Sequence, residues 1–312
     1  MGIAAIGEVM VELAPYRSVM EGAREVKVLS YAGDTFNTAV YLARLGVPTD
    51  YVTLLGDDSQ SDHMLKVMAD ESIGTAAIKR IPGACPGLYM ISNTSDGERE
   101  FTYWRKDAPA RQLFGSDHAA AVLAEQLAEC SAVYVSGITL AIIPATARRR
   151  LIDFLKNFRA GGGAVAFDSN YRPRLWQSTA EAQQAVMAVM AHTDIALLTL
   201  DDEQLLWGDG SIESCRERYR AFTLPELVLK RGAREVVVIT PEHQQSIPVP
   251  PVKGVVDTTG AGDSFNAGYL AARLQGATPA HAASAGIRCA AIVIRHAGGV
   301  IDRSTFLREY NP

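Results

Sequence analysis

The chain has 312 residues, of which 48% are hydrophobic and 21% charged, and its formal net charge is −5 at neutral pH. This is ordinary globular usage, with enough length for one large α/β domain or two ordinary domains. The acidic balance, with no basic cluster beyond residues 148–150, argues against nucleic acid as a partner. No apolar run approaches the length of a membrane span and no signal-like segment precedes the first apolar run, so we expect a cytoplasmic protein with no membrane partner.

The cysteines also bear on the class of protein. The four cysteines lie far apart and form no Cys-x-x-Cys pair, and the six histidines show no metal-ligand spacing. We therefore expect reduced, mostly buried thiols rather than a disulfide framework or a zinc site.

Apolar runs of strand length alternate with amphipathic runs of helical length along the chain. The expected strands are residues 3–6, 50–55, 132–135, 164–167, 195–198, 227–229 and 236–239. The expected helices include residues 37–45, 59–71, 144–159, 180–192 and 264–274. This alternation predicts a parallel sheet covered by helices on both faces, with ligands bound beyond the carboxyl ends of the strands. No linker or repeat interrupts it, so residues 1–312 are expected to form a single domain.

One region breaks the alternation. Residues 85–94 and 100–105 are β-rich runs around the turn cluster 95–98, which predicts a hairpin. With residues 9–13 and 25–29 the hairpin would form a small separate sheet. The two-residue period of a strand places Phe101, Tyr103 and Arg105 on one face, where Tyr89 can join them from the partner strand. A hairpin with a solvated tyrosine and arginine remains the alternative.

A polar segment follows the buried strand at residues 164–167, at the edge where ligands are expected. Pro173 confines Arg172 to an extended conformation. A guanidinium held in this way suits bidentate recognition of a carboxylate, and a structural salt bridge is the alternative.

The most informative segment is residues 257–265, which read Asp-Thr-Thr-Gly-Ala-Gly-Asp-Ser-Phe. Residues 255–256 are expected to end a strand, and residue 264 to begin a helix. Gly260 and Gly262 let the backbone turn tightly and approach a ligand, and the first-turn N–H groups of the helix favour an anion such as a phosphoryl group. Asp263 is placed to accept a proton from an attacking hydroxyl, or else simply caps the helix. The segment fits neither a P-loop nor a dinucleotide fingerprint.

These nine residues resemble the carboxy-terminal signature Asp-Thr-x-Gly-Ala-Gly-Asp of the ribokinase-like (PfkB) family of sugar kinases. The resemblance implies an α/β fold: a doubly wound, mostly parallel sheet flanked by helices, with a small β-sheet lid over the sugar, here about residues 9–32 and 85–106. It also implies that the backbone of Gly260, Ala261 and Gly262 forms the anion hole and that Asp263 is the catalytic base.

Further segments match the family at its other sites. Gly33, Asp34 and Asn37 lie where the family binds the sugar hydroxyls, although Asp34 could instead cap the following helix. On the nucleotide side, the resemblance implies that ATP is bound by Thr199, Lys230, Gly232 and Ala233 together with Gly260 and Gly262. A surface basic pair is the alternative at Lys230. Asp202 stands at the position of the family's acid that organises magnesium, and Asn170 is a further polar candidate beside the metal.

Within this family, the segments around Gly7, Pro86, Phe101, Asn170 and Thr199 are most similar to the bacterial 2-keto-3-deoxygluconate kinases. That similarity implies that Tyr89, Tyr103, Arg105 and Arg172 hold a sugar acid whose carbon-6 hydroxyl receives the phosphoryl group of magnesium-ATP. The chemistry agrees independently, since two arginines beside tyrosines suit a carboxylate rather than a neutral sugar. A kinase of another sugar such as fructose, and a non-catalytic sugar-acid sensor, are the alternatives, and a homo-oligomer is left open.

Overall fold

The computed structural model describes residues 2–21, 24–93, 99–222 and 224–310. Within that part of the chain, nine strands form one sheet in the order β15-β14-β13-β12-β11-β10-β1-β4-β6. Their bounds are β1 (Ile3–Ile6), β4 (Thr49–Val52), β6 (Ile73–Gly74), β10 (Ala132–Ser136), β11 (Ala164–Asp168), β12 (Ile195–Thr199), β13 (Glu226–Lys230), β14 (Glu235–Ile239) and β15 (Gln244–Pro248). From β6 to β13 all neighbours pair in parallel, and β14 and β15 are antiparallel. The predicted mostly parallel sheet is confirmed.

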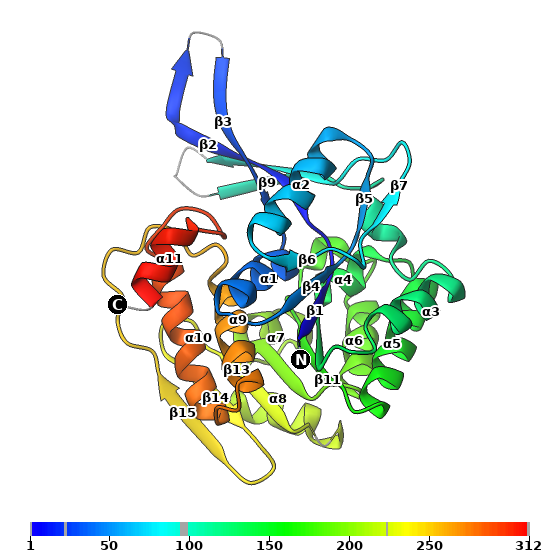
Figure 1. The fold of residues 1–312 in the computed structure, drawn as a ribbon. Coiled ribbons are helices and arrows are strands. Elements are labelled where there is room, and N and C mark those ends of the chain that lie inside the picture. Colours follow the sequence, from blue (N-terminus) through cyan, green and yellow to red (C-terminus); the bar gives the residue numbers. More distant parts are fainter. Residues whose placement is uncertain (1, 22–23, 94–98, 223, 311–312) are drawn as a thin grey trace.

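Helices cover both faces of this sheet because successive strand residues point to opposite sides. In β1, Ile3 and Ala5 belong to one buried cluster and Ala4 and Ile6 to the other. The first cluster packs against α1 (Asp34–Arg44), α2 (Ser59–Asp70), α9 (Ala261–Leu274), α10 (Pro279–Val293) and α11 (Arg303–Tyr310). The second packs against α3 (Asp117–Gln126), α4 (Gly137–Ile142), α5 (Ala145–Ala160), α6 (Thr179–Met190), α7 (Leu200–Trp207) and α8 (Ile212–Tyr219). Figure 1 shows α9 and α10 on one side of the strands and α5 and α6 on the other.

The parallel strands bring their carboxyl ends to one edge of the sheet. Ser136 pairs with Asp168 across β10 and β11, and Thr199 pairs with Lys230 across β12 and β13. Gly7 follows the end of β1 at the same edge. Residues from distant parts of the sequence therefore line one rim, where ligands of such sheets bind.

A second sheet has four strands in the order β3-β2-β8-β9, namely β3 (Arg24–Ala32), β2 (Met10–Glu21), β8 (Leu88–Asn93) and β9 (Arg99–Trp104). The predicted hairpin is confirmed as the antiparallel pair of β8 and β9, in which Tyr89 lies opposite Tyr103. Its turn cluster, residues 95–98, lies outside the described residues. Figure 1 shows the β2 and β3 hairpin projecting away from the helices and the large sheet.

Two strand predictions were wrong. Residues 50–55 divide into β4 of the large sheet and β5 (Leu54–Gly56), which pairs with β7 (Lys79–Ile81). Val255 and Val256 form no strand and are 51% and 64% exposed. Pro250 and Pro251 precede them, and because proline has no N–H to donate, the chain leaves the sheet after β15.

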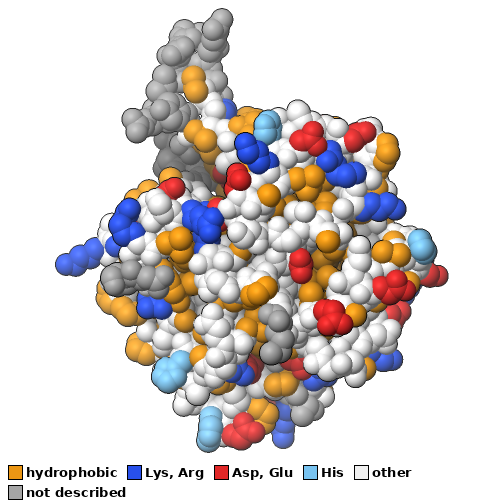
Figure 2. Space-filling model, viewed as in Figure 1, with side chains coloured by type: hydrophobic (Ala, Val, Ile, Leu, Met, Phe, Trp, Pro, Cys, Tyr) orange, Lys and Arg blue, Asp and Glu red, His pale blue; other side chains and the backbone are white. Residues whose placement is uncertain are grey.

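Basic and acidic side chains are interspersed on the face shown in Figure 2. The cysteines agree only in part with the expectation of mostly buried thiols. All four cysteines are free; Cys215 and Cys289 are buried, Cys130 is half-buried and Cys85 is exposed. In the described part of the chain, none of the helices has the length and apolar character needed to cross a membrane.

Candidate active site

Asp263 lies in the first turn of α9, at the rim formed by the strand ends. The helix begins after Gly260, which has a left-handed backbone (φ 73°) and which Gly299 approaches so closely that a side chain would clash. Asp263 is not the helix cap, because Gly260 holds that position and the Asp263 carboxylate instead accepts a hydrogen bond from Asn37 Nδ2 at 2.8 Å. Burial, and then the nearby carboxylate of Asp34, raise the pKa of Asp263 to about 7. A carboxylate with this pKa suits a general base near neutral pH.

The start of α9 also presents backbone donors beside this carboxylate. The N–H of Ala261 donates to Thr258 O at 3.2 Å, and that of Ser264 donates to Gly260 O at 2.8 Å. Among the described residues, the N–H groups of Gly260, Gly262 and Asp263 have no acceptor. A side chain at Gly262 would meet only Lys230 Nζ, at 3.8 Å, so there is room for a ligand. The donors left for an anion are therefore those of Gly260, Gly262 and Asp263, not that of Ala261.

The predicted sugar-binding turn lies against Asp263. Gly33 precedes α1, and a side chain there would overlap the backbone oxygen of Glu8. Asp34 accepts a hydrogen bond from Asn170 Nδ2 at 2.8 Å, and burial raises its pKa. The structure thus brings together Asp34, Asn37 and Asn170, from two separate motifs, beside the proposed base.

Lys230 lies in a buried polar network at the end of β13. Its Nζ donates to Asp168 Oδ2 at 3.2 Å and to Asn266 Oδ1 at 2.9 Å, while Asn266 Nδ2 donates to Asp168 Oδ2 at 2.6 Å. The surface-pair alternative is wrong, because Lys230 is only 7% exposed. The network holds an ammonium group next to the free N–H groups of α9.

A cavity of about 510 Å³ opens from this point and continues away from Asp263. Thr199, Lys230, Gly232, Ala233 and Gly262, all predicted to bind the nucleotide, line it. The rest of the wall is largely apolar and comes from α9, α10 and the proline-containing segment after β15. Its size and apolar lining suit the base and sugar of a nucleotide, whose phosphates would point toward Lys230 and α9.

The predicted sugar-acid residues form a cluster on the four-stranded sheet. The ring centroids of Tyr89 and Tyr103 are 5.7 Å apart, and the Arg105 guanidinium lies 5.8 Å from the centroid of Tyr103. Tyr103 is 48% exposed, whereas Tyr89 is 7% exposed and donates its hydroxyl hydrogen to Glu12. Arg105 pairs with the buried carboxylate of Glu8. The shared aromatic face is present as the strand period predicts, and Tyr103 is its exposed member.

Arg172 and Asp202 come together, although they were predicted for different ligands. Arg172 Nη1 lies 3.3 Å from Asp202 Oδ1, and the two side chains are 52% and 18% exposed. Burial raises the pKa of Asp202, and the charge of Arg172 counters this. A surface pair of this kind contributes little to stability, so either partner can exchange it for a ligand at small cost.

In the part of the chain that the structure describes, no three His, Cys, Asp or Glu side chains gather as a ready-made metal site. Magnesium bound with a nucleotide needs only one or two protein carboxylates, since phosphates and water supply the other ligands. Asp202 is partly exposed and, among the described residues, accepts hydrogen bonds only from Arg172 and the Tyr171 backbone, so it fits that requirement.

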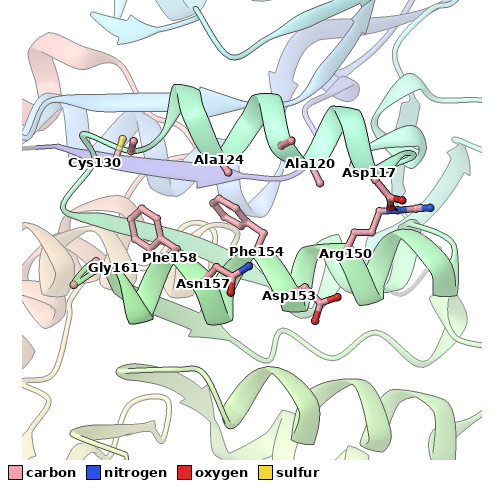
Figure 3. A pocket seen from close by; sticks show the side chains of 14 residues that line it. Asp117, Ala120, Ala124, Cys130, Arg150, Asp153, Phe154, Asn157, Phe158 and Gly161 are labelled. Atoms are coloured by element: carbon pink, nitrogen blue, oxygen red, sulfur yellow. Dashed lines mark hydrogen bonds and ion pairs between the residues drawn. The ribbon is translucent and has the colours of Figure 1, made fainter.

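A second cavity, of about 580 Å³, lies away from this rim between α3 and α5. Figure 3 shows Phe154 and Phe158 of α5 directed into it and an ion pair of Asp117 with Arg150 near one end. None of the residues predicted for the site lines this cavity.

Three residues of the site were not assigned from the sequence. Asp168 could have been recognised, because it ends a buried strand at the ligand-binding edge. Asn266 lies on the buried face of α9 and carries no local signal. Glu8 follows β1, and its importance rests on its partner Arg105, 97 residues later.

Residues 2–305 match the profile of the pfkB family carbohydrate kinases. The 2-dehydro-3-deoxygluconokinase of Escherichia coli K12 is 44% identical over 308 residues, covering 96% of this chain and 97% of that protein. The enzyme of the same name from Dickeya dadantii is 43% identical over 307 residues and covers 96% of each chain. Among solved structures, the PfkB protein from Polaromonas sp. JS666 superposes with a TM-score of 0.83 at 25% identity, covering 97% of this chain and 98% of that one.

Proposed function

Because this chain belongs to the pfkB family of carbohydrate kinases, we propose that it transfers the γ-phosphoryl group of ATP to carbon 6 of 2-keto-3-deoxygluconate, also called 2-dehydro-3-deoxygluconate. The observation that carries this proposal is the arrangement at the rim. Asp263 lies in a helix start that presents free N–H donors beside the nucleotide cavity, and its charge also acts on Tyr89 of the tyrosine and arginine cluster.

The substrate has its two distinctive groups at opposite ends of a six-carbon chain. Its carboxylate, at carbon 1, is held by Arg105 and Arg172, with Tyr103 alongside. Its terminal hydroxyl, at carbon 6, lies at Asp263. Binding at one end therefore positions the reacting oxygen at the other, which is how a substrate-holding residue contributes to rate.

Asp263 accepts the proton of that hydroxyl as its oxygen attacks the γ-phosphorus. Asn37 holds one oxygen of the carboxylate and leaves the other for the substrate. The N–H groups of Gly262 and Asp263 and the ammonium group of Lys230 stabilise the charge on the transferring group. Asp168 and Asn266 keep Lys230 in place.

Asp202 would hold magnesium, which when bound neutralises the charge of the phosphates. Asn170 is a second candidate ligand, although its Nδ2 donates to Asp34. The four-stranded sheet acts as the lid: by covering the sugar acid it excludes water, the competing acceptor. Gly33, Asp34 and Asn37 form the floor beneath it.

An assay of ADP release over a panel of sugars and sugar acids tests this function. The panel includes 2-keto-3-deoxygluconate and 3-deoxyfructose, which is identical from carbon 2 to carbon 6 but carries a hydroxymethyl group in place of the carboxylate. We expect the acid to be the preferred substrate by at least about tenfold in kcat/KM, the value of one charge-assisted hydrogen bond. Equal rates for the two compounds, or a preference for fructose, would make a neutral-sugar kinase the better assignment.

A further inference from the structure

Glu8 is a buried carboxylate that the proposed mechanism does not use. It is 3% exposed and lies in the three-residue link between β1 of the large sheet and β2 of the lid sheet. Its partner Arg105 directly follows β9, where the chain leaves the lid sheet. The ion pair therefore joins the point where the chain enters the lid to the point where it leaves.

The backbone around the Glu8–Arg105 pair leaves space for both side chains. At Gly87, a side chain would lie 3.0 Å from Glu8 Oε1 and 3.2 Å from Arg105 Cβ, so a glycine leaves the space that the two side chains fill. The N–H of Val11 donates to Gly87 O at 2.8 Å and fixes that backbone. Both side chains of the pair are at least nine-tenths buried.

The pair also leaves hydrogen-bonding capacity unused. Glu8 Oε2 accepts a hydrogen bond from Arg105 Nη2, and neither Arg105 Nε nor Glu8 Oε1 has a partner among the described residues. A guanidinium carries five N–H donors in a fixed plane. The bond to Glu8 limits the directions in which the remaining N–H groups can point, and Tyr103 lies beside the guanidinium as the exposed aromatic of the lid face.

We propose that Glu8 is a positioning residue that holds the Arg105 guanidinium in the orientation needed to receive the carboxylate of the sugar acid. The inference rests on the function proposed above. An arginine side chain loses much conformational freedom when it binds a ligand, and a partner that orders it beforehand removes that loss from the binding step. Glu8 also places a negative charge near the incoming carboxylate, which opposes binding. Positioning outweighs this repulsion because a buried guanidinium without a counter-charge would turn toward water and leave the site.

The test compares Glu8→Gln with the parent on 2-keto-3-deoxygluconate and on 3-deoxyfructose. Glutamine keeps the shape and removes the charge. We expect kcat/KM for the acid to fall about tenfold or more, mainly through KM, and the value for the neutral analogue to change by less than about threefold. In an Arg105→Met background the same substitution should have almost no further effect, since the two residues act as a unit.

Glu203→Gln is the matched control. Glu203 is also a buried glutamate paired with an arginine, Arg218, and its Oε1 likewise has no partner. The substitution Glu203→Gln should lower the thermal stability of the protein without changing its preference for the acid over the neutral analogue. If Glu8→Gln does not fold, Gly87→Ala separates the pair without a change of charge and should give the same selective loss.

Four outcomes would overturn the inference. An equal loss on both substrates, or effects of Glu8→Gln and Arg105→Met that simply add, would make the pair a structural tie between the two sheets. A gain in affinity for the acid would show that Glu8 competes with the substrate. A parent that takes acid and neutral analogue equally well would instead contradict the proposed function, and this inference with it.

Discussion

The raised pKa of Asp263 makes the pH dependence of the reaction a direct test of its role as base. A base works only when deprotonated, so kcat/KM should follow the ionised fraction of Asp263. With a pKa of about 7, that fraction falls to roughly a tenth at pH 6 and a hundredth at pH 5. An aspartate of ordinary pKa, about 3.9, would be almost fully ionised at both.

The change that tests the physical cause is Asp34→Asn. After burial, the charge of Asp34 is the largest cause of the raised pKa of Asp263. Removing that charge lowers the pKa of Asp263, so the acidic limb of the profile should move to lower pH. Asparagine can still accept the hydrogen bond from Asn170, which preserves the local contact. The maximal activity at high pH should fall as well, because Asp34 lies in the turn that we propose binds the sugar, but the position of the acidic limb is independent of that loss.

The assay is ADP release by parent and variant between pH 5 and 9 at low concentration of the sugar acid. Phosphate groups of ATP also titrate, at about pH 6. Both proteins share that titration, so the displacement between the two curves isolates the enzyme's own group. A limb that stays in place in Asp34→Asn, or a flat profile down to pH 5, would refute the assignment of Asp263 as a base tuned by burial and Asp34.

Three further variants test the same contacts. Asp263→Asn should lower turnover by about 100- to 10,000-fold while nucleotide binding, measured by titration, stays within a few-fold, and a near-normal turnover would remove Asp263 from the chemistry. The same variant should unfold at higher temperature than the parent at pH 8. Folding raises the pKa of Asp263 from 3.8 to about 7, so the Asp263 carboxyl stabilises the folded state at low pH and loses that contribution as the pH rises through 7. The gain in free energy of unfolding over the parent corresponds to roughly three pKa units at about 1.4 kcal/mol each, so it cannot exceed about 4 kcal/mol. This gain should shrink toward pH 4. A gain that is the same at every pH would show another cause. Asp202→Ala should raise the magnesium concentration for half-maximal rate without weakening the binding of the sugar acid, since it also frees Arg172, and an unchanged magnesium dependence would exclude Asp202 from the metal site. Arg172→Met should reduce kcat/KM for the acid by about 10- to 150-fold and that for 3-deoxyfructose much less, as expected for a charge-assisted hydrogen bond; equal losses would make Arg172 structural.

The sequence predicted those parts of the fold whose signals are local. Buried parallel strands such as β11 and β12 are continuous apolar runs, and α9 follows a glycine turn, so both could be recognised from neighbouring residues. The error at Val255 and Val256 arose because two apolar β-branched residues resemble a strand, while the prolines before them prevent the pairing.

At the site, the residue types were predictable but their partners were not. Asp263 and Asn37 are 226 positions apart and are joined by a hydrogen bond that only the packing of α1 against α9 produces. The pairing of Arg172 with Asp202 and of Arg105 with Glu8 likewise depends on where distant strands end. Long-range contacts of this kind decide which donors are free and which pKa values shift, and no local pattern records them.

Identification of the product tests the central claim most directly. The protein is incubated with 2-keto-3-deoxygluconate and magnesium-ATP, and the product is examined by phosphorus and carbon nuclear magnetic resonance. We predict a single phosphate monoester whose phosphorus couples to carbon 6, with the carboxylate at carbon 1 unmodified. A phosphate at any other carbon, an acyl phosphate at carbon 1, or release of ADP without a phosphorylated sugar acid would contradict it.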